Sequence, residues 1–188
     1  MIVSLGEVEA MVRKAARGAG WPWGHAEELG ASARALCAAG FPGAALAAAL
    51  LDAHGDDGTC PIRQSAHWCD TRQLPDASVT VRCPLLSVPL LATVFCSDNR
   101  VLQARWDGAM ITADATGHTC ADDPHRAATT GARGIKFTAV HHTPASQAVA
   151  RAVGVEVQDA NWHALDRHAQ HSYVPASEQS RMGAGPTD

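Results

Sequence analysis

The strongest constraint on the fold is a change in the period of the apolar residues near residue 78. Before this point apolar residues recur with helical spacing. After it, Val79, Val81 and Cys83 alternate with polar residues, as in a strand. Helices that come first and strands that follow favour an α+β fold over a parallel doubly wound sheet. The sequence therefore predicts Ala-rich amino-terminal helices, a central and mostly antiparallel sheet, and a carboxy-terminal helix.

The helical part has clear start and stop signals. Ser4 and Glu7 have the spacing of a capping box, and Gly18 and Gly20 end the apolar pattern that follows. The segment Trp21-Pro22-Trp23-Gly24 predicts a rigid turn, and Gly40 lies just past the second helix. The predicted helices of this part span about residues 4–17, 24–39 and 44–53.

Beyond the helices, residues 54–77 are rich in Gly, Asp and Pro and predict a long loop, of the kind that is functional or disordered in compact domains. Asp107-Gly108 predicts a hairpin turn, and residues 118–133 look irregular. The remaining elements are predicted as strands over 79–83, 86–96, 101–106, 110–115 and 135–141, and as helices over 145–152 and 161–171.

The length of 188 residues suits a single domain. We divide it into a helical part (1–54), a long loop (55–77), a β part (78–142), and a helix with a Gly- and Ser-containing tail (143–188).

Composition narrows the class of protein. A net charge of −4 leaves no basic footprint for nucleic acid, and the longest apolar run is too short to cross a bilayer. The first residues lack the basic region and apolar stretch of a secretory signal. We therefore expect a cytoplasmic protein with no membrane partner, in which the six cysteines are free thiols. A disulfide framework is the alternative.

Ten histidines are many for this length, and one set of soft ligands stands out. Cys60, His67 and Cys69 form the pattern C-x6-H-x-C within the predicted loop, and thiolate with imidazole is a ligand set that zinc uses. No matching second half follows, so loop thiols without a function are the alternative. The histidines also leave open a site for zinc, iron or copper.

The amino-terminal turn is dense in charge and aromatic rings. Arg13, Lys14 and Arg17 cluster at the end of the first predicted helix, where cations also suit the helix dipole. Glu27 and Glu28 are predicted in the first turn of the second helix, where the dipole favours acids. Capping explains this pattern, and so does a site for a carboxylate or a phosphate.

The carboxy-terminal stretch has a similar character. Tyr173, Ser177 and Arg181 lie in a segment that also contains Pro175 and a Gly-Ala-Gly run. A tail of this composition is disordered unless it docks, and its Tyr and Pro favour docking, conceivably as a lid.

At these two stretches the chain resembles an uncharacterised bacterial family, domain of unknown function 3726. His25 replaces the aliphatic residue usual in the family, and His168 and His171 look like additions, which indicates a divergent, His-rich member. The family carries no activity that can be transferred. The resemblance rests on residues 4–10, 17–24, 26–28, Trp162, 173–177, 180–181 and the Gly-Ala-Gly tail.

These observations predict an enzyme that acts on a small anionic metabolite, in specialised metabolism, by acid/base chemistry that a metal could assist. Arginine pairs with carboxylates through two donors, so Arg17 and Arg181 are expected to hold the anion. The other expected binding residues are Trp21, Trp23, Tyr173 and Ser177.

For catalysis we expect Glu27 or Glu28 as general base, and a histidine (His25, His141 or His67) as its acid partner. The alternative is a non-catalytic accessory or ligand-binding protein that partners a larger enzyme. In that case a low-charge, Ala-rich helical face would be buried against another subunit, in a hetero- or homo-oligomer.

Overall fold

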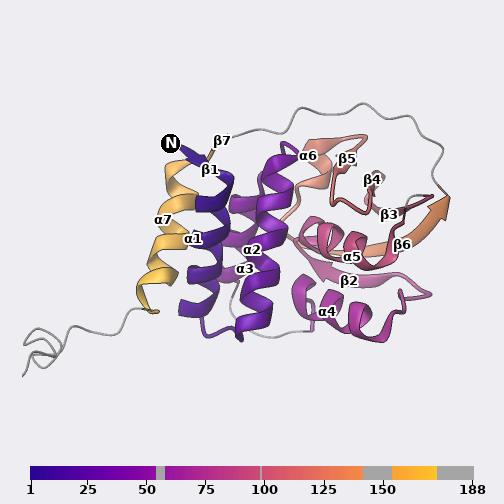
Figure 1. Cartoon of the computed structure of the whole chain (residues 1–188), viewed down its shortest axis with the longest axis horizontal. Coiled ribbons are helices and arrows are strands. Elements are labelled where there is room, and N and C mark those ends of the chain that lie inside the picture. The colour runs from indigo at the N-terminus through magenta and orange to yellow at the C-terminus, as the bar shows by residue number, and fades with distance from the viewer. Residues whose placement is uncertain (54–57, 98, 142–153, 173–188) are drawn as a thin grey trace, which may run out of the picture.

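A computed structural model describes residues 1–53, 58–97, 99–141 and 154–172. Four helices form a layer on one side of the molecule, and the sheet lies on the other side (Figure 1). The helices of the layer are α1 (Leu5–Gly18), α2 (Trp23–Ala38), α3 (Gly43–Asp52) and α7 (Asp159–Gln170). Although α7 is distant in sequence, it packs against both α1 and α3.

Helix α1 begins as its sequence predicts. The Ser4 hydroxyl accepts a hydrogen bond from the Glu7 amide, and the Glu7 carboxylate accepts one from the Ser4 amide. These two bonds satisfy amides that the first turn leaves unpaired. The hydrogen bond with the Ser4 amide lowers the pKa of Glu7 below its ordinary value, and the bond with the Ser4 side chain adds a smaller effect in the same direction.

Two glycines allow backbones in the helical layer to touch. A Cβ at Gly18 would lie 1.7 Å from the carbonyl oxygen of His168 on α7, and one at Gly43 would lie 2.2 Å from that of Ala33 on α2. No larger residue fits these contacts without displacing backbone. Nearby, His168 Nε2 lies 2.8 Å from the carboxylate of Asp52, which joins α7 to α3.

The sheet is antiparallel throughout its described strands. Its order is β2-β6-β3-β4-β5, with β3 in the centre, where Leu102 faces Ala139 of β6 and Ala113 of β4. The Asp107-Gly108 hairpin is confirmed, and both residues have positive φ, as a tight hairpin turn requires. The strands are β2 (Val79–Arg82), β3 (Arg100–Trp106), β4 (Ala109–Ala113), β5 (Thr119–Ala121) and β6 (Ala132–His141).

A second, two-stranded sheet joins the beginning of the chain to its last third. Strand β1 (Ile2–Ser4) pairs antiparallel with β7 (Gly154–Glu156), so that Val3 lies opposite Val155. This pairing lies beside the starts of α1 and α7, and together with the packing of α7 on α1 it fixes the carboxy-terminal helix on the amino-terminal one.

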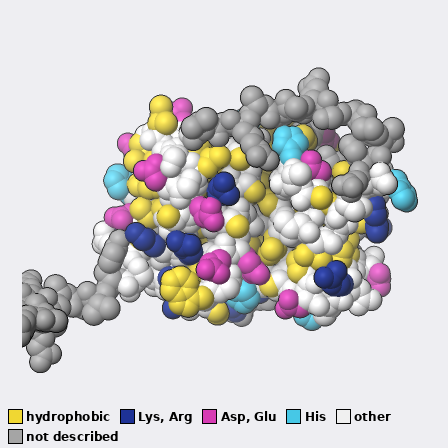
Figure 2. All heavy atoms as spheres, viewed as in Figure 1, with side chains coloured by type: hydrophobic (Ala, Val, Ile, Leu, Met, Phe, Trp, Pro, Cys, Tyr) yellow, Lys and Arg dark blue, Asp and Glu magenta, His cyan; other side chains and the backbone are white. Residues whose placement is uncertain are grey.

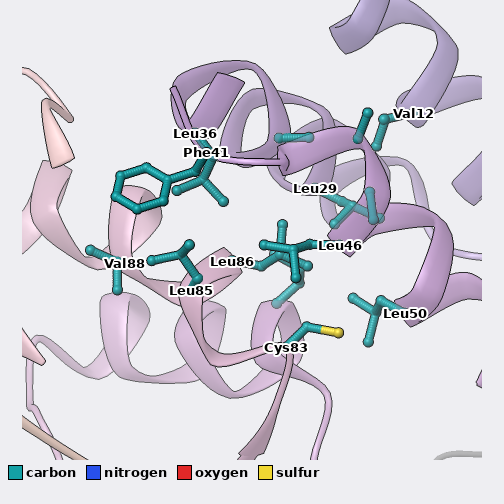
Figure 3. Close-up of a cluster of buried hydrophobic side chains, with 14 of the residues drawn as sticks. Val12, Leu29, Leu36, Phe41, Leu46, Leu50, Cys83, Leu85, Leu86 and Val88 are labelled. Carbon is teal, nitrogen blue, oxygen red and sulfur yellow. The ribbon is translucent and has the colours of Figure 1, made fainter. Parts of the chain in front are cut away.

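One core connects the helical layer to the sheet. Leu85, Leu86 and Val88 project from the segment after β2 and meet apolar side chains of α2 and α3 (Figure 3). That segment consists of η1, a 3₁₀ turn (Pro84–Leu86), and α5 (Ser87–Phe95). The partners labelled in Figure 3 include Leu29, Leu36, Phe41 and Leu46.

Two predicted elements were wrong. The predicted loop 54–77 contains helix α4 (Pro61–Thr71), which starts with Pro61 at its first position and buries Ile62 and Ser65. The predicted strand 86–96 is instead α5. A nearly continuous apolar run has no period to read, and Pro89 fits in the first helical turn because amides there lack helical partners.

Two further segments bear on the predictions. The stretch 118–133 is not wholly irregular, because it contains β5 and the short helix α6 (Pro124–Ala127). The predicted helix 145–152 falls outside the described residues.

The α+β class is confirmed, with mostly antiparallel strands and a carboxy-terminal helix. All six cysteines are free thiols, as expected. In the described part of the chain no helix is both long and apolar enough to span a membrane.

Candidate functional site

A hollow of about 470 Å³ lies where α1 ends, α2 begins and α7 ends. Of the residues expected to form a site, it contains Arg17 and Trp23. Its described lining residues are Arg13, Lys14, Arg17, Trp23, His171 and Ser172. We call it the basic hollow.

Arg17 is held in place by the turn that follows it. Its guanidinium donates a hydrogen bond to the carbonyl of Trp21 and lies 4.8 Å from the centroid of the Trp23 ring. The Trp23 side chain is 61% exposed, whereas Trp21 packs against the core. The turn therefore orients one arginine and presents one indole to solvent, and Trp21 contributes through its backbone.

The helical period brings the cations together. Arg13 and Arg17 are four residues apart and so lie on the same side of α1, with Lys14 beside them. In Figure 2, Lys and Arg side chains gather near the lower end of the helical layer, beside exposed hydrophobic and acidic side chains. Because α1 meets α7 closely at Gly18, His171 and Ser172 form another wall of the hollow.

The cations of the basic hollow form no ion pairs in the parts of the protein that the structure describes. Within them, neither Arg13, Lys14 nor Arg17 forms an ion pair, whereas Arg34 on α2 pairs with Glu9 at 3.5 Å. The carboxy-terminal dipole of α1 stabilises these cations in part. The remaining positive potential is open to an anionic ligand.

The predicted acid and base residues lie elsewhere on α2. Helix α2 begins at Trp23, so Glu27 and Glu28 fall in its second turn, and their expected place in the first turn was wrong. Glu28 lies five positions after Trp23, which places it about 140° around the helix, while Glu27 is only about 40° away. Glu27 is therefore exposed on the side of Trp23, and Glu28 turns away from it.

Glu28 and His25 share the side of α2 that faces α4. Burial, and secondarily the charge of Asp70 on α4, raise the pKa of Glu28. Its Oε2 atom and the Nδ1 atom of His25 are buried and have no hydrogen-bond partner among the described residues. A half-buried carboxyl group of this kind holds its proton more readily than an exposed one, which suits acid/base chemistry.

The three predicted metal ligands are not brought together. Cys60 caps the start of α4, while His67 and Cys69 are two residues apart on the helix and point about 200° from each other. Burial, with smaller effects of Glu28 and Asp70, raises the pKa of Cys69 to about 11, which disfavours the thiolate a metal needs. Across the described ranges, no three His, Cys, Asp or Glu side chains are grouped to hold a metal ion.

The other predicted residues are remote or not described. His141 ends β6, on the side of the molecule away from α1 (Figure 1). Tyr173, Ser177 and Arg181 lie outside the described residues.

Sequence reasoning missed His171 and Ser172 as members of the basic hollow. Their position just after the predicted helix 161–171 was visible, but its packing against α1 was not. Gly18 gave the one usable signal, because a glycine at a helix end can mark a close approach as well as a cap.

Comparison with known proteins adds a family likeness and no activity. No curated protein and no solved structure matches the chain. Residues 3–79 match the model of a family described as "Protein of unknown function (DUF3726)". This range includes α1, α2 and the turn between them, and it ends at the start of β2, before α7 and the carboxy-terminal stretch. Over its helical amino-terminal part, the chain thus resembles the DUF3726 family.

Proposed function

We propose that the protein binds a small anionic metabolite in the basic hollow. The observation that carries this proposal is the lining: three cations and a histidine surround the hollow, and its described lining residues include no acid. A cytoplasmic location suits a metabolite-binding protein with six free thiols.

The chemistry of the hollow favours a carboxylate attached to a flat, apolar body. The hydrogen bond to the Trp21 carbonyl and the stacking on Trp23 orient the Arg17 guanidinium, which offers several donors in one plane. Arg13 and Lys14 add charge, and the exposed Trp23 ring offers an apolar surface. A phosphate would satisfy the cations equally, whereas an aromatic carboxylate also uses the indole.

Acid/base catalysis is a second candidate function, which the state of Glu28 favours. Its raised pKa and unpartnered oxygen, with the unpartnered Nδ1 of His25 on the same side of α2, are the properties expected of a proton-transfer pair. Because this pair faces α4, a substrate would have to reach it there and not through the basic hollow.

The accessory role has less support. Large exposed hydrophobic side chains in the described ranges are Met1, Ile2, Trp23 and Val94, which are scattered over separate elements. The buried alanines of α2 and α3 (Ala26, Ala33, Ala44, Ala47 and Ala48) pack within the molecule and cannot cover another subunit.

Benzoate and its neutral analogue benzamide test the proposed anion site by calorimetry or NMR titration at low salt. Benzoate should bind at least ten-fold more tightly than benzamide, and its affinity should fall as salt is added. R17Q, which removes the oriented guanidinium, should weaken benzoate binding about ten-fold.

R34Q is the matched control, because it removes the same charge from a residue that pairs with Glu9 and does not line the hollow. It should change benzoate affinity less than two-fold. Equal binding of benzoate and benzamide, or equal effects of the two substitutions, would show that the basic hollow is not an anion site.

A further inference from the structure

The structure assigns a second binding site, for a small neutral and mostly apolar molecule, to a hollow of about 500 Å³. This hollow lies where the α2–α3 turn, α6, β7 and the start of α7 meet. It shares no described lining residue with the basic hollow, and the inference does not depend on the proposed function. We call it the apolar hollow.

Its walls are apolar and fixed by the core. Phe41 and Val157, which are 5% and 4% exposed, belong to the main core cluster and present part of their surface to the hollow. Ala45 on α3 and Ala128 after α6 lie on separate segments that border the space. These small side chains leave room that larger ones would fill, and preformed apolar concavities of this size are typical of small-molecule sites.

The charges around the apolar hollow oppose one another. Its described lining residues include no Lys or Arg, and their ionisable side chains are Cys37, His125 and Glu156. The starts of α3 and α7 border the same space with partial positive charge, which attracts an anion and opposes a cation, whereas the Glu156 carboxylate does the reverse. A neutral molecule does not depend on either charge, and the Asn161 amide can hydrogen-bond one polar group on it.

Indole, tryptamine and indole-3-acetate test this assignment, because they share one ring system and differ in charge. Titration of the ¹⁵N-labelled protein should show indole binding with a Kd of about 1 mM or tighter, as expected for a ligand of this size. The amide shifts should centre on Phe41 and Val157. Tryptamine and indole-3-acetate should each perturb these amides with at least five-fold weaker affinity.

Two filling substitutions, on separate segments that line the hollow, locate the site. A45L and A128L should each weaken indole binding at least ten-fold, whereas A45S, which keeps the volume, should change it less than three-fold. Thermal unfolding checks that each variant is folded. If A45L and A128L both prevent folding, the map of amide shifts that indole causes in the unsubstituted protein tests the assignment by itself.

Three results would overturn the assignment: no shifts at 5 mM indole, shifts centred away from Phe41 and Val157, or indole affinity unchanged in a folded A45L or A128L variant. Indole-3-acetate also separates the two proposals. If indole-3-acetate causes no amide shifts near Arg17, this result counts against the anion site and does not bear on the assignment of the apolar hollow.

Discussion

The two sides of α2 carry opposite chemistry. Toward α1 and α7, Trp23 joins a group of cations that are open to solvent and lack ion pairs within the described residues. Toward α4, Glu28 is half-buried near Asp70 and Cys69, and its pKa is raised. Glu28 lies only five positions after Trp23 in the sequence.

This difference teaches that residues adjacent in sequence need not form one site. Because each residue advances about 100° around a helix, the expected unit of Arg17, Trp23, His25 and Glu28 divides between two faces. One face carries cations without ion pairs among the described residues, and the other carries a carboxyl group whose pKa is raised. Experiments that change one face and leave the other intact can therefore test the division.

The largest effect is expected from G18A, which places a Cβ atom in the close contact between α1 and α7. The new Cβ would meet the His168 carbonyl oxygen at 1.7 Å, a backbone atom that cannot move alone. We expect a loss of about 3 kcal/mol in the free energy of unfolding, measured by chemical denaturation. Benzoate binding should fall with it.

G24A is the control for G18A, because a Cβ at Gly24 meets no atom within 4 Å. It should leave stability unchanged or raise it by less than about 1 kcal/mol, since Ala favours the helix more than Gly. Similar stability of G18A and G24A would mean that α7 does not pack on α1 as closely as described.

A moderate effect is expected from W23A, which changes only the face toward α1 and α7. Removal of the exposed indole eliminates its stacking with Arg17 and the apolar surface beside it, so benzoate affinity should fall about five-fold. The melting temperature should change by less than about 2 °C, since most of this side chain is in solvent. Unchanged affinity would exclude the indole from the site.

The smallest effect concerns E28Q on the face toward α4. Because folding raises the pKa of Glu28, the unfolded chain releases this proton first as pH rises. The contribution of Glu28 to the free energy of unfolding is therefore fully present below the ordinary carboxyl pKa. It falls as pH rises from the ordinary to the raised pKa and stays lower above the raised pKa. Gln does not ionise, so E28Q should remove this loss.

For E28Q we expect a melting temperature about 1–2 °C higher at pH 7, allowing for solvent screening, and no difference at pH 4. Benzoate affinity should not change. E27Q, on the exposed neighbour, is the control and should show no such pH dependence of stability. A melting temperature of E28Q that is lower at pH 7 would mean that the ionised carboxylate stabilises the fold.

Local signals in the sequence predicted much of the fold. The Ser4–Glu7 capping box, the glycines after the first two helices and the Asp107-Gly108 turn each act over a few residues, and the elements they mark are present. The failures, α4 and α5, are segments whose conformation depends on burial. Helix α5 is apolar on every side, and α4 lies between turn-rich stretches.

The candidate site was predictable to the extent that it is local. Arg17, Trp21 and Trp23 lie together because one short turn joins them. The walls formed by His171 and Ser172 depend on the packing of α7 against α1, which one sequence does not reveal. The neighbour that His25 and Glu28 face depends on how α2 packs against α4, which one sequence does not reveal.

The pairing of β1 with β7 and of α1 with α7 has a consequence for the order of biosynthesis. Strand β1 and helix α1 are made before β7 and α7, so they find these partners only after residues 154–170 have been made. Leu165 of α7, which is fully buried in the finished protein, therefore joins the core only after that part of the chain has been made. The segment that matches the family model is thus made before α7, which packs on its helices α1 and α3.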